Sequence, residues 1–427
     1  METGEFIRQQ FYKLFLILLF SIESVSAKYH ADIVVDAQGT GEYKTITEAI
    51  NALPMYQYQR TVVYIKNGIY EEHLRIDQNY ITLRGESKDS TIIRYSLLRE
   101  EWNKNKDWIG PGVINLEGDD IILDNLTIEN SQPEIGPHAF VIYGLNPNRT
   151  IIINCNVLSK GGDTVSLWNY KEGMYYHAKC YFQGAVDFVC PRGWCFIKDS
   201  QFYELKETAA IWHAGSYQPD QKFVLRNCDF DGVINFELGR HHYQAQFYLL
   251  DCNFSENMKN KPIYKVYDNN PDHNNPLYAG ERDYYFNCRK KGQQYDWYKN
   301  NLDQASDNLK PEDITPDWTF DGKWNPEETD PIYITSYELM GDTVIFTFSE
   351  IVSIRNEPVI ENDSGRQFNI VEQRYNDINR LSFYSNTVIT DSDLEGNLIL
   401  ISGDIIASTA YVQDRSIGKS FVIRILN

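Results

Sequence analysis

Two acidic residues and one arginine stand where they could do chemistry together. Asp187 lies inside the apolar run Ala185–Val189, and a buried carboxylate is costly to keep ionised unless a cation lies beside it. Arg240 is the predicted cation. Asp163, which follows two glycines, supplies a second carboxyl group. These residues are far apart along the chain, so the fold must bring them together.

A repeated unit of short apolar runs and polar turns is suited to that task. It extends from about residue 68 to about residue 256, and its clearest copies are centred on Asn154-Cys155, Asn227-Cys228 and Asp251-Cys252. With Cys180 and Ser200 as further register marks, the steps between copies are 25, 20, 28 and 24 residues. Such periods with short strands predict a solenoid, in which each coil buries its apolar face on the next. Chemistry would lie on one outer sheet face, where neighbouring coils bring distant residues together.

The cysteines favour an interior ladder over disulfide bonds. The chain has seven of them, so at least one thiol is unpaired. The repeated positions are Cys155, Cys180, Cys228, Cys252 and Cys288. Small residues at one position of successive coils would stack inside a solenoid, although a disulfide framework is the alternative. No Cys or His spacing is typical of zinc, so no metal site is expected.

The first residues of the chain predict export. Residues 1–27 place Arg8 and Lys13 before the apolar run Leu14–Phe20 and end in small residues, as a cleaved signal peptide does. The run is too short to span a membrane as a helix. No other membrane-spanning segment is expected.

The rest of the chain divides into two predicted domains. Residues 28–330 are assigned to the solenoid, with a short helix at 45–53 and with loops and a helix over the last coils. Residues 331–427 carry strand-like runs at the spacing of an immunoglobulin-like β-sandwich. These runs are 344–348, 398–401 and 421–425.

The net charge and the composition limit the classes of binding partner that are expected. The formal charge of −20 over 427 residues argues against nucleic acid, because phosphate binding requires a basic surface. The same charge disfavours a fully anionic polymer and fits a nearly neutral, esterified one better. The 30 Tyr residues are typical either of a surface that stacks on sugar rings or of ordinary β-sheet composition.

The ordered motifs of residues 31–326 resemble the pectin methylesterases of carbohydrate esterase family eight. The motifs are an opening turn and helix at 39–46, Gly-x-Tyr-x-Glu at 68–72, Val-Asp-Phe-Val at 186–189, Leu-Gly-Arg at 238–240 and Trp-x-Pro at 324–326. The resemblance implies a right-handed parallel β-helix. With the C-terminal β-sandwich, the expected fold class is all-β.

The resemblance also implies roles in the hydrolysis of galacturonic acid methyl esters in pectin. Asp187 would be the nucleophile, Asp163 the acid/base and Arg240 the guanidinium that holds Asp187. This division of labour agrees with the chemistry, since ester hydrolysis needs a nucleophile, a proton for the leaving methoxide and donors for the oxyanion. Arg240 is expected to lower the pKa of Asp187, while Asp163 stays protonated. No cofactor is expected.

The chain departs from the family pattern around these residues. Gly162 stands where the family has the Gln before the acid, and His138 stands where it has a second Gln at the head of a strand. A ring nitrogen of His138 and the backbone of Gly162 are the donors left at those positions. His241-His242 replaces Pro-Trp after Arg240, so contacts to the sugar are expected to differ.

Further substrate-binding residues are predicted, each with a structural alternative. Trp168 and Trp212 are placed in loops after the coils that carry the two acids, where they would stack on pyranose rings or pack in the core. Phe188, His213 and His242 are assigned to the same site. For the two histidines, a satisfied packing role is the alternative.

The predicted protein is therefore a secreted or periplasmic pectin esterase that acts as a monomer. One alternative is an esterase of the same fold for a different or decorated pectic polysaccharide. The other is a non-catalytic polysaccharide-binding β-helix with a decayed oxyanion hole. In that case Asp187 and Arg240 are only a structural ion pair, and Asp163 is a turn residue that bonds its own backbone.

Overall fold

The computed structural model describes residues 31–423 of the chain with several gaps. The gaps are 57–59, 216–219, 268, 270–273, 275, 307, 329–330, 350–351, 372–378, 408–416, 418–419 and 422. The predicted signal peptide lies outside the described residues. In the described part, no helix is long and apolar enough to cross a membrane.

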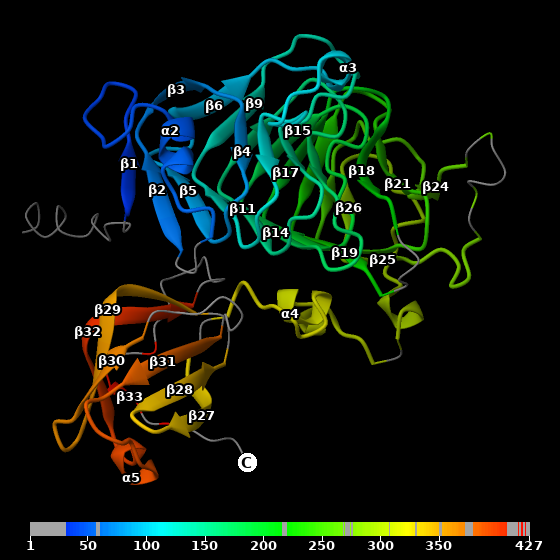
Figure 1. Cartoon of the computed structure of the whole chain (residues 1–427). Helices are drawn as coiled ribbons and strands as arrows, with labels where there is room; N and C mark the ends of the chain where they lie inside the picture. Colours follow the sequence, from blue (N-terminus) through cyan, green and yellow to red (C-terminus); the bar gives the residue numbers. More distant parts are fainter. Residues whose placement is uncertain are drawn as a thin grey trace, which may run out of the picture.

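Parallel strands of successive coils stack into three faces, which Figure 1 shows from blue to green. The first face is a ten-stranded sheet of β1 (Ile33–Val35), β2 (Thr61–Ile65), β5 (Ile81–Gly85), β8 (Ile122–Asp124), β11 (Thr150–Ile153), β14 (Met174–Ala178), β16 (Trp194–Lys198), β19 (Lys222–Arg226), β22 (Gln246–Leu250) and β25 (Asp283–Phe286). The second face is a nine-stranded sheet of β3 (Gly68–Glu71), β6 (Thr91–Tyr95), β9 (Thr127–Asn130), β12 (Asn156–Leu158), β15 (Tyr181–Gly184), β17 (Gln201–Glu204), β20 (Asp229–Gly232), β23 (Asn253–Phe254) and β26 (Arg289–Lys290).

The third face consists of two shorter sheets. One contains β4 (Leu74–Ile76), β7 (Ile114–Leu116), β10 (Ile142–Gly144) and β13 (Val165–Leu167), and the other contains β18 (Ala209–His213), β21 (Glu237–His241) and β24 (Tyr264–Lys265). This arrangement is a parallel β-helix and confirms the predicted solenoid. The coils continue beyond residue 256, because β25 and β26 add one more copy around Asn287-Cys288.

One turn of the coil explains the sequence repeat. The residue between the first and second faces has a left-handed backbone, with φ between 50° and 58°, at Asn125, Asn154, Lys179, Asp199, Asn227, Asp251 and Asn287. Asn and Asp tolerate this conformation better than other residues with a side chain. Their side chains also bond along the stack, as where Asn154 Nδ2 donates to Asn125 Oδ1 at 2.8 Å. The turn therefore favours the Asn or Asp found at six of these seven positions, and Lys179 is the exception.

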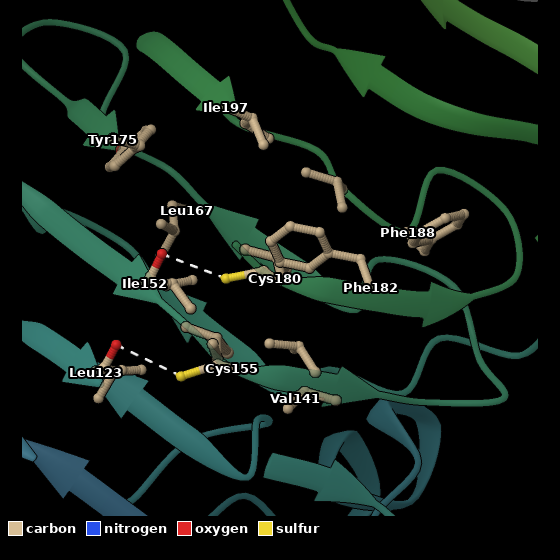
Figure 2. Close-up of a cluster of buried hydrophobic side chains, with 14 of the residues drawn as sticks. Leu123, Val141, Ile152, Cys155, Leu167, Tyr175, Cys180, Phe182, Phe188 and Ile197 are labelled. Carbon is tan, nitrogen blue, oxygen red and sulfur yellow. Dashed lines mark hydrogen bonds between the residues drawn. The ribbon is translucent and has the colours of Figure 1, made fainter. Parts of the chain in front are cut away.

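The cysteines that follow these turns point into the interior. Their Sγ atoms lie 3.3 to 3.7 Å from a carbonyl oxygen of the preceding coil, at Cys155, Cys180, Cys228, Cys252 and Cys288. Figure 2 shows the first two of these contacts. All seven cysteines are described and are free. The predicted thiol ladder is confirmed.

Aromatic rings fill the interior beside the thiol ladder. Phe182, Phe202, Phe230 and Phe254 follow one another along the second face, with successive ring centroids 5.3, 4.5 and 5.7 Å apart. All four rings are buried. Each coil thus adds apolar area against its neighbour, which is how a solenoid gains stability.

Short helices cover the β-helix. The predicted N-terminal helix is α2 (Ile46–Asn51), which Thr45 caps and which buries Ile46, Ala49 and Ile50 against the first coil. Further helices are α3 (Arg99–Lys104), η3 (Leu302–Gln304), η4 (Pro311–Asp313) and α4 (Pro316–Thr319). The segment with η3, η4 and α4 packs Phe320 and Trp324 over the first face, as expected for 257–330.

The C-terminal strands form an antiparallel sheet with its own core, drawn in yellow to red in Figure 1. Its elements are β27 (Ile334–Met340), β28 (Thr343–Phe348), β29 (Val352–Asn362), β30 (Gln367–Ile370), β31 (Arg380–Tyr384), α5 (Asp391–Leu394), β32 (Leu398–Ala407) and β33 (Ser420–Phe421). The seven strands form one sheet in the order β27-β28-β31-β30-β29-β32-β33, and the long strand β29, which pairs with β30 and β32, is irregular near Asn356. The all-β fold class, a parallel β-helix followed by an antiparallel β unit, is confirmed.

Candidate active site

The third face is interrupted where the two acids lie. On this face, the coil between β13 and β18 has no strand among the described residues and makes single β-bridges, from Val189 to Val165 and Ile211 and from Arg192 to Trp168. Just before these bridges the backbone leaves the strand conformation.

Three residues at this interruption have a left-handed backbone. They are Asp163 (φ 55°), Val186 (φ 58°) and Asp187 (φ 55°). This conformation is a genuine outlier for a β-branched residue such as Val186, so the surrounding packing must hold it. The acids therefore lie on tight bends between coils and not within strands.

Arg240 clamps Asp187 from two coils further along the β-helix. From β21, Arg240 Nε donates to Asp187 Oδ1 at 2.8 Å and Nη2 donates to Oδ2 at 2.6 Å. Asp187 is only 7% exposed. A two-point guanidinium contact is the strongest and most directional way to hold a buried carboxylate. The geometry provides the cation that the sequence required.

Asp163 has no comparable partner. It is 6% exposed, and within 4 Å its only cationic group among the described residues is the His138 ring, whose Nε2 lies 3.7 Å from Asp163 Oδ2. Burial, followed by the charge of Arg99, lowers the pKa of His138, so the ring favours its neutral form. Asp163 thus faces a weak donor.

The pKa values of the two acids do not separate as predicted. Burial raises the pKa of Asp163 to about 6, against the charges of Arg192, Arg99 and Arg240. Burial also raises the pKa of Asp187 to about 6, against its bonds to Arg240. The expected lowering for Asp187 is wrong, because loss of water outweighs the guanidinium. When the pair holds one proton, Asp163 carries it, since Arg240 bonds only Asp187.

A cavity of about 240 Å³ joins these groups. It is lined by Arg99, His138, Asp163, Trp168, Asp187, Arg192, Trp212, Arg240, His242 and Val266. Seven of the predicted site residues are in this set. Arg99, Arg192 and Val266 were not predicted. Arg192 could have been found by the argument used for Asp187, because it is a lone charge between Val189-Cys190 and Trp194-Cys195.

Three predicted site residues do not offer a free group to the cavity. The ring of Phe188 is fully buried and packs on Phe202 in the interior. His213 is also fully buried, and its two ring nitrogens contact the backbone of Gly193 and Gly215. Substrate contact through either side chain is wrong, because the bend at Val186 and the inward face of β18 turn both rings to the core.

Gly162 is the third of these residues. Its N–H donates to the carbonyl of Pro137 at 3.0 Å, and its own carbonyl accepts from Ala139. The backbone donor assigned to Gly162 is therefore already used within the fold. An oxyanion in the cavity must find its donors elsewhere.

Aromatic side chains form one wall of the cavity. Trp168 directly follows β13, and Trp212 lies within β18 and not in a loop. Between their rings lies the guanidinium of Arg192, whose Cζ is 3.6 Å from the Trp168 centroid and 4.7 Å from that of Trp212. His242 meets Trp212 edge to face at 5.4 Å. This wall combines flat apolar surface with positive charge.

No metal is indicated at this wall or elsewhere in the described part of the chain, where no three His, Cys, Asp or Glu side chains gather as a metal site would require. The chemistry available is that of two carboxyl groups and guanidinium donors. Such a set can attack a carbonyl carbon, transfer one proton and stabilise negative charge on oxygen.

The fold and the cavity define a parallel β-helix protein with a paired-carboxylate site on its third face. A family model described as Pectinesterase matches residues 32–249 of the 427. The chain belongs to the pectinesterase family.

Known proteins of this family are similar to the chain over part of their length. Pectinesterase 31 of Arabidopsis thaliana is 31% identical over 164 residues, which are 36% of this chain and 50% of that protein. Pectinesterase of Petunia integrifolia is 27% identical over 218 residues, which are 48% of this chain and 54% of that protein. The chain thus spans about half the length of these curated relatives.

Solved structures share the fold at low sequence identity. Pectin methylesterase PemA from Erwinia chrysanthemi has a TM-score of 0.56 at 18% identity, with 70% of this chain and 100% of that chain covered. A pectin methylesterase in complex with a hexasaccharide has a TM-score of 0.58 with the same identity and coverage.

Proposed function

We propose that the protein hydrolyses methyl esters of galacturonic acid in pectin and releases methanol. The observation that carries this proposal is the Asp187–Arg240 clamp beside Asp163 in one small cavity. Membership of the pectinesterase family supports the reaction class. The hexasaccharide bound by a protein of the same fold supports an oligosaccharide substrate.

The first half of the reaction is transfer of the acyl group to Asp187. A carboxylate oxygen of Asp187 attacks the ester carbonyl carbon, and an oxyanion forms. When the oxyanion collapses, the bond to methoxide breaks, and Asp163 gives methoxide its proton. Arg240 keeps Asp187 ionised and oriented for the attack.

The second half returns the enzyme to its starting state. Ionised Asp163 takes a proton from water, and the water oxygen attacks the acyl carbon of the anhydride. The bond to Asp187 breaks, so the galacturonic acid leaves and Asp187 is again a carboxylate. Asp163 acts first as acid and then as base, which its raised pKa of about 6 favours.

Methanol release from esterified pectin tests the proposal. The wild type is expected to release methanol, and Asp187→Asn is expected to lower the rate by about 10⁴-fold or more, because the nucleophile is lost. Asp199→Asn is the matched control, since Asp199 also has a left-handed backbone but lies at the turn between β16 and β17. It should retain wild-type activity.

Two outcomes would replace the proposal. If the wild type releases methanol only from branched or acetylated pectic fractions, the substrate is a decorated polysaccharide. If it binds the polymer and releases none from any pectic ester, the protein is a binding β-helix and not an esterase.

We also propose a two-domain organisation with export. Separate hydrophobic cores on either side of residues 329–330 support division into 28–330 and 331–427. The predicted signal at 1–27 supports a secreted or periplasmic location, where pectin would be met. Deleting 331–427 should leave turnover of soluble substrate nearly unchanged. Loss of that turnover would contradict the proposed independence.

A further inference from the structure

Arg192 holds an unusual place at the cavity. Its side chain lies between Trp168 and Trp212, and the residue is 5% exposed. Its backbone N–H donates to the carbonyl of Leu167 at 2.8 Å, which anchors it to the preceding coil. Its guanidinium atoms Nε and Nη1 are buried and have no hydrogen-bond partner in the structure.

Two buried guanidinium nitrogens without hydrogen-bond partners are costly. A buried donor left unpaired destabilises the folded protein, and a charged donor does so more than a neutral one. By contrast, Arg149 bonds Asp120 through two nitrogens at 2.9 and 2.7 Å. No carboxylate of the described residues lies within 4 Å of Arg192 in an ion pair. Stacking on two rings offsets part of the cost but supplies no acceptor.

The position of Arg192 directs this charge to the reacting groups. It lines the same cavity as Asp163 and Asp187, and its bridge to Trp168 continues the third face beyond Asp187. Among the cations that oppose the raised pKa of Asp163, Arg192 contributes most, ahead of Arg99 and Arg240. Arg192 and Asp163 thus line one cavity, which a ligand atom could enter.

Most other donors at the cavity are committed or exposed, and the one further buried donor without a partner in its lining, Trp212 Nε1, is neutral and carries no charge to oppose that of an oxyanion. The Gly162 N–H bonds Pro137, and Arg240 uses Nε and Nη2 on Asp187. The His138 ring is half-exposed and faces Asp163. Arg99 is also partly open to water, where a charge stabilises an anion less than it does in a sheltered site.

We propose that Arg192 is a catalytic residue that donates to the ester carbonyl oxygen as it becomes the oxyanion. The inference rests on the proposed function and assigns the donor that the reaction requires. Arg192 keeps its proton throughout, because a guanidinium stays charged in proteins. Negative charge forms on the carbonyl oxygen when Asp187 attacks, and it returns to the leaving methoxide, which Asp163 protonates.

The first test distinguishes the role of the N–H donors of Arg192 from the role of its stacking on the two tryptophans. Arg192→Met keeps an unbranched side chain between the two tryptophans and removes every N–H. Its kcat for methanol release should fall by roughly 10²–10³, as for loss of one oxyanion donor, while KM changes by less than about threefold. Arg226→Met is the matched control, because Arg226 is a half-buried arginine of β19 on the first face. It should keep wild-type kcat.

The second test is chemical rescue. Arg192→Ala leaves a gap between Trp168 and Trp212, and millimolar guanidinium should restore its kcat in a saturable way. The same salt should not rescue Arg192→Met, whose side chain fills the gap. A purely structural Arg192 would lower the melting temperature of both variants and would give no saturable rescue.

The outcomes distinguish this inference from the proposed function. If the wild type releases methanol but Arg192→Met keeps kcat within about threefold, or if guanidinium rescues neither variant, Arg192 is not the oxyanion donor and the esterase proposal stands. If the wild type releases no methanol from any pectic ester, the proposed function fails, and the catalytic role of Arg192 fails with it.

Discussion

The two edges of the β-helix are built in opposite ways. At the turn between the first and second faces, successive coils repeat a left-handed residue, in most coils Asn or Asp, and in five coils a cysteine such as Cys228 follows it and points inward. At the third face, the left-handed residues are Asp163, Val186 and Asp187, and buried charges interrupt the strand ladder. The regular edge stabilises the stack. At the irregular edge, strained backbone and buried charges lower the stability of the fold but hold the two carboxyl groups in position for chemistry.

Because the reactive groups lie at the irregular edge, a substitution there should have the largest effect on activity. Asp163→Asn keeps size and polarity but cannot transfer a proton, so methanol release should fall by about 10²–10⁴-fold. The loss should appear in kcat while the melting temperature stays within a few degrees of the wild type. Asp199→Asn, at the regular edge, is the control. Equal activity of the two variants would show that Asp163 has no acid/base role.

The activity of the irregular edge should depend on pH on both sides of about 6. Burial raises the pKa of both Asp163 and Asp187 to about 6. Below this pH Asp187 gains a proton and loses its nucleophilic oxygen, and above it Asp163 loses the proton that methoxide needs. A plot of kcat/KM against pH should therefore be bell-shaped with its maximum near pH 6, and each limb should fall about tenfold per unit. A level plateau through alkaline pH would contradict the acid role of Asp163.

A buried acid under the irregular edge should make stability depend on pH. Glu204 of β17 is fully buried, and burial raises its pKa to about 9. The folded protein keeps this proton at a pH where the unfolded chain has lost it. The free energy of unfolding should therefore fall as pH rises between about 5 and 8, by up to about 1.4 kcal/mol per unit.

Urea unfolding of the wild type and of Glu204→Gln at pH 5 and pH 8 measures the contribution of Glu204 to this pH dependence. The amide cannot ionise, so the variant should gain about 4 kcal/mol relative to the wild type between pH 5 and pH 8. Glu100→Gln, on exposed α3, is the control and should show no such gain. A constant difference between wild type and Glu204→Gln would mean that Glu204 is ionised in the folded protein.

The smallest effect is expected at the regular edge. Asn227 has φ of 52°, so Asn227→Ala should lower the free energy of unfolding by about 1–2 kcal/mol. Asn227→Gly should lower it less, because glycine adopts this backbone without strain. Thermal unfolding measures both, and methanol release should be unchanged. An equal loss for Ala and Gly would assign the effect to the side-chain bond with Asp199 at 2.6 Å.

The regular edge could be predicted because the same turn recurs from coil to coil and favours similar residues each time. Asn154-Cys155 and Asn227-Cys228 are visible as copies without knowledge of their contacts. The partnership of Asp187 and Arg240 was also accessible, since a charge in an apolar run requires a counter-charge.

The irregular edge was only partly predictable because it depends on contacts between coils. The left-handed bend at Val186 has no signature in residue preference, yet it turns Phe188 inward. Arg99 comes from α3 on an earlier coil, and no local pattern connects it to Asp163. The pKa of Asp187 was predicted in the wrong direction because the extent of its burial is a property of the packed cavity.

The thiol ladder has a practical consequence for making and handling the protein. Every cysteine is reduced, and the stacked Sγ atoms contact backbone carbonyls inside the coils. Folding of the chain therefore requires no oxidant and no disulfide isomerase. A reducing cytosol should yield the same folded state as an oxidising compartment, and thiol reductants should leave both the melting temperature and turnover unchanged.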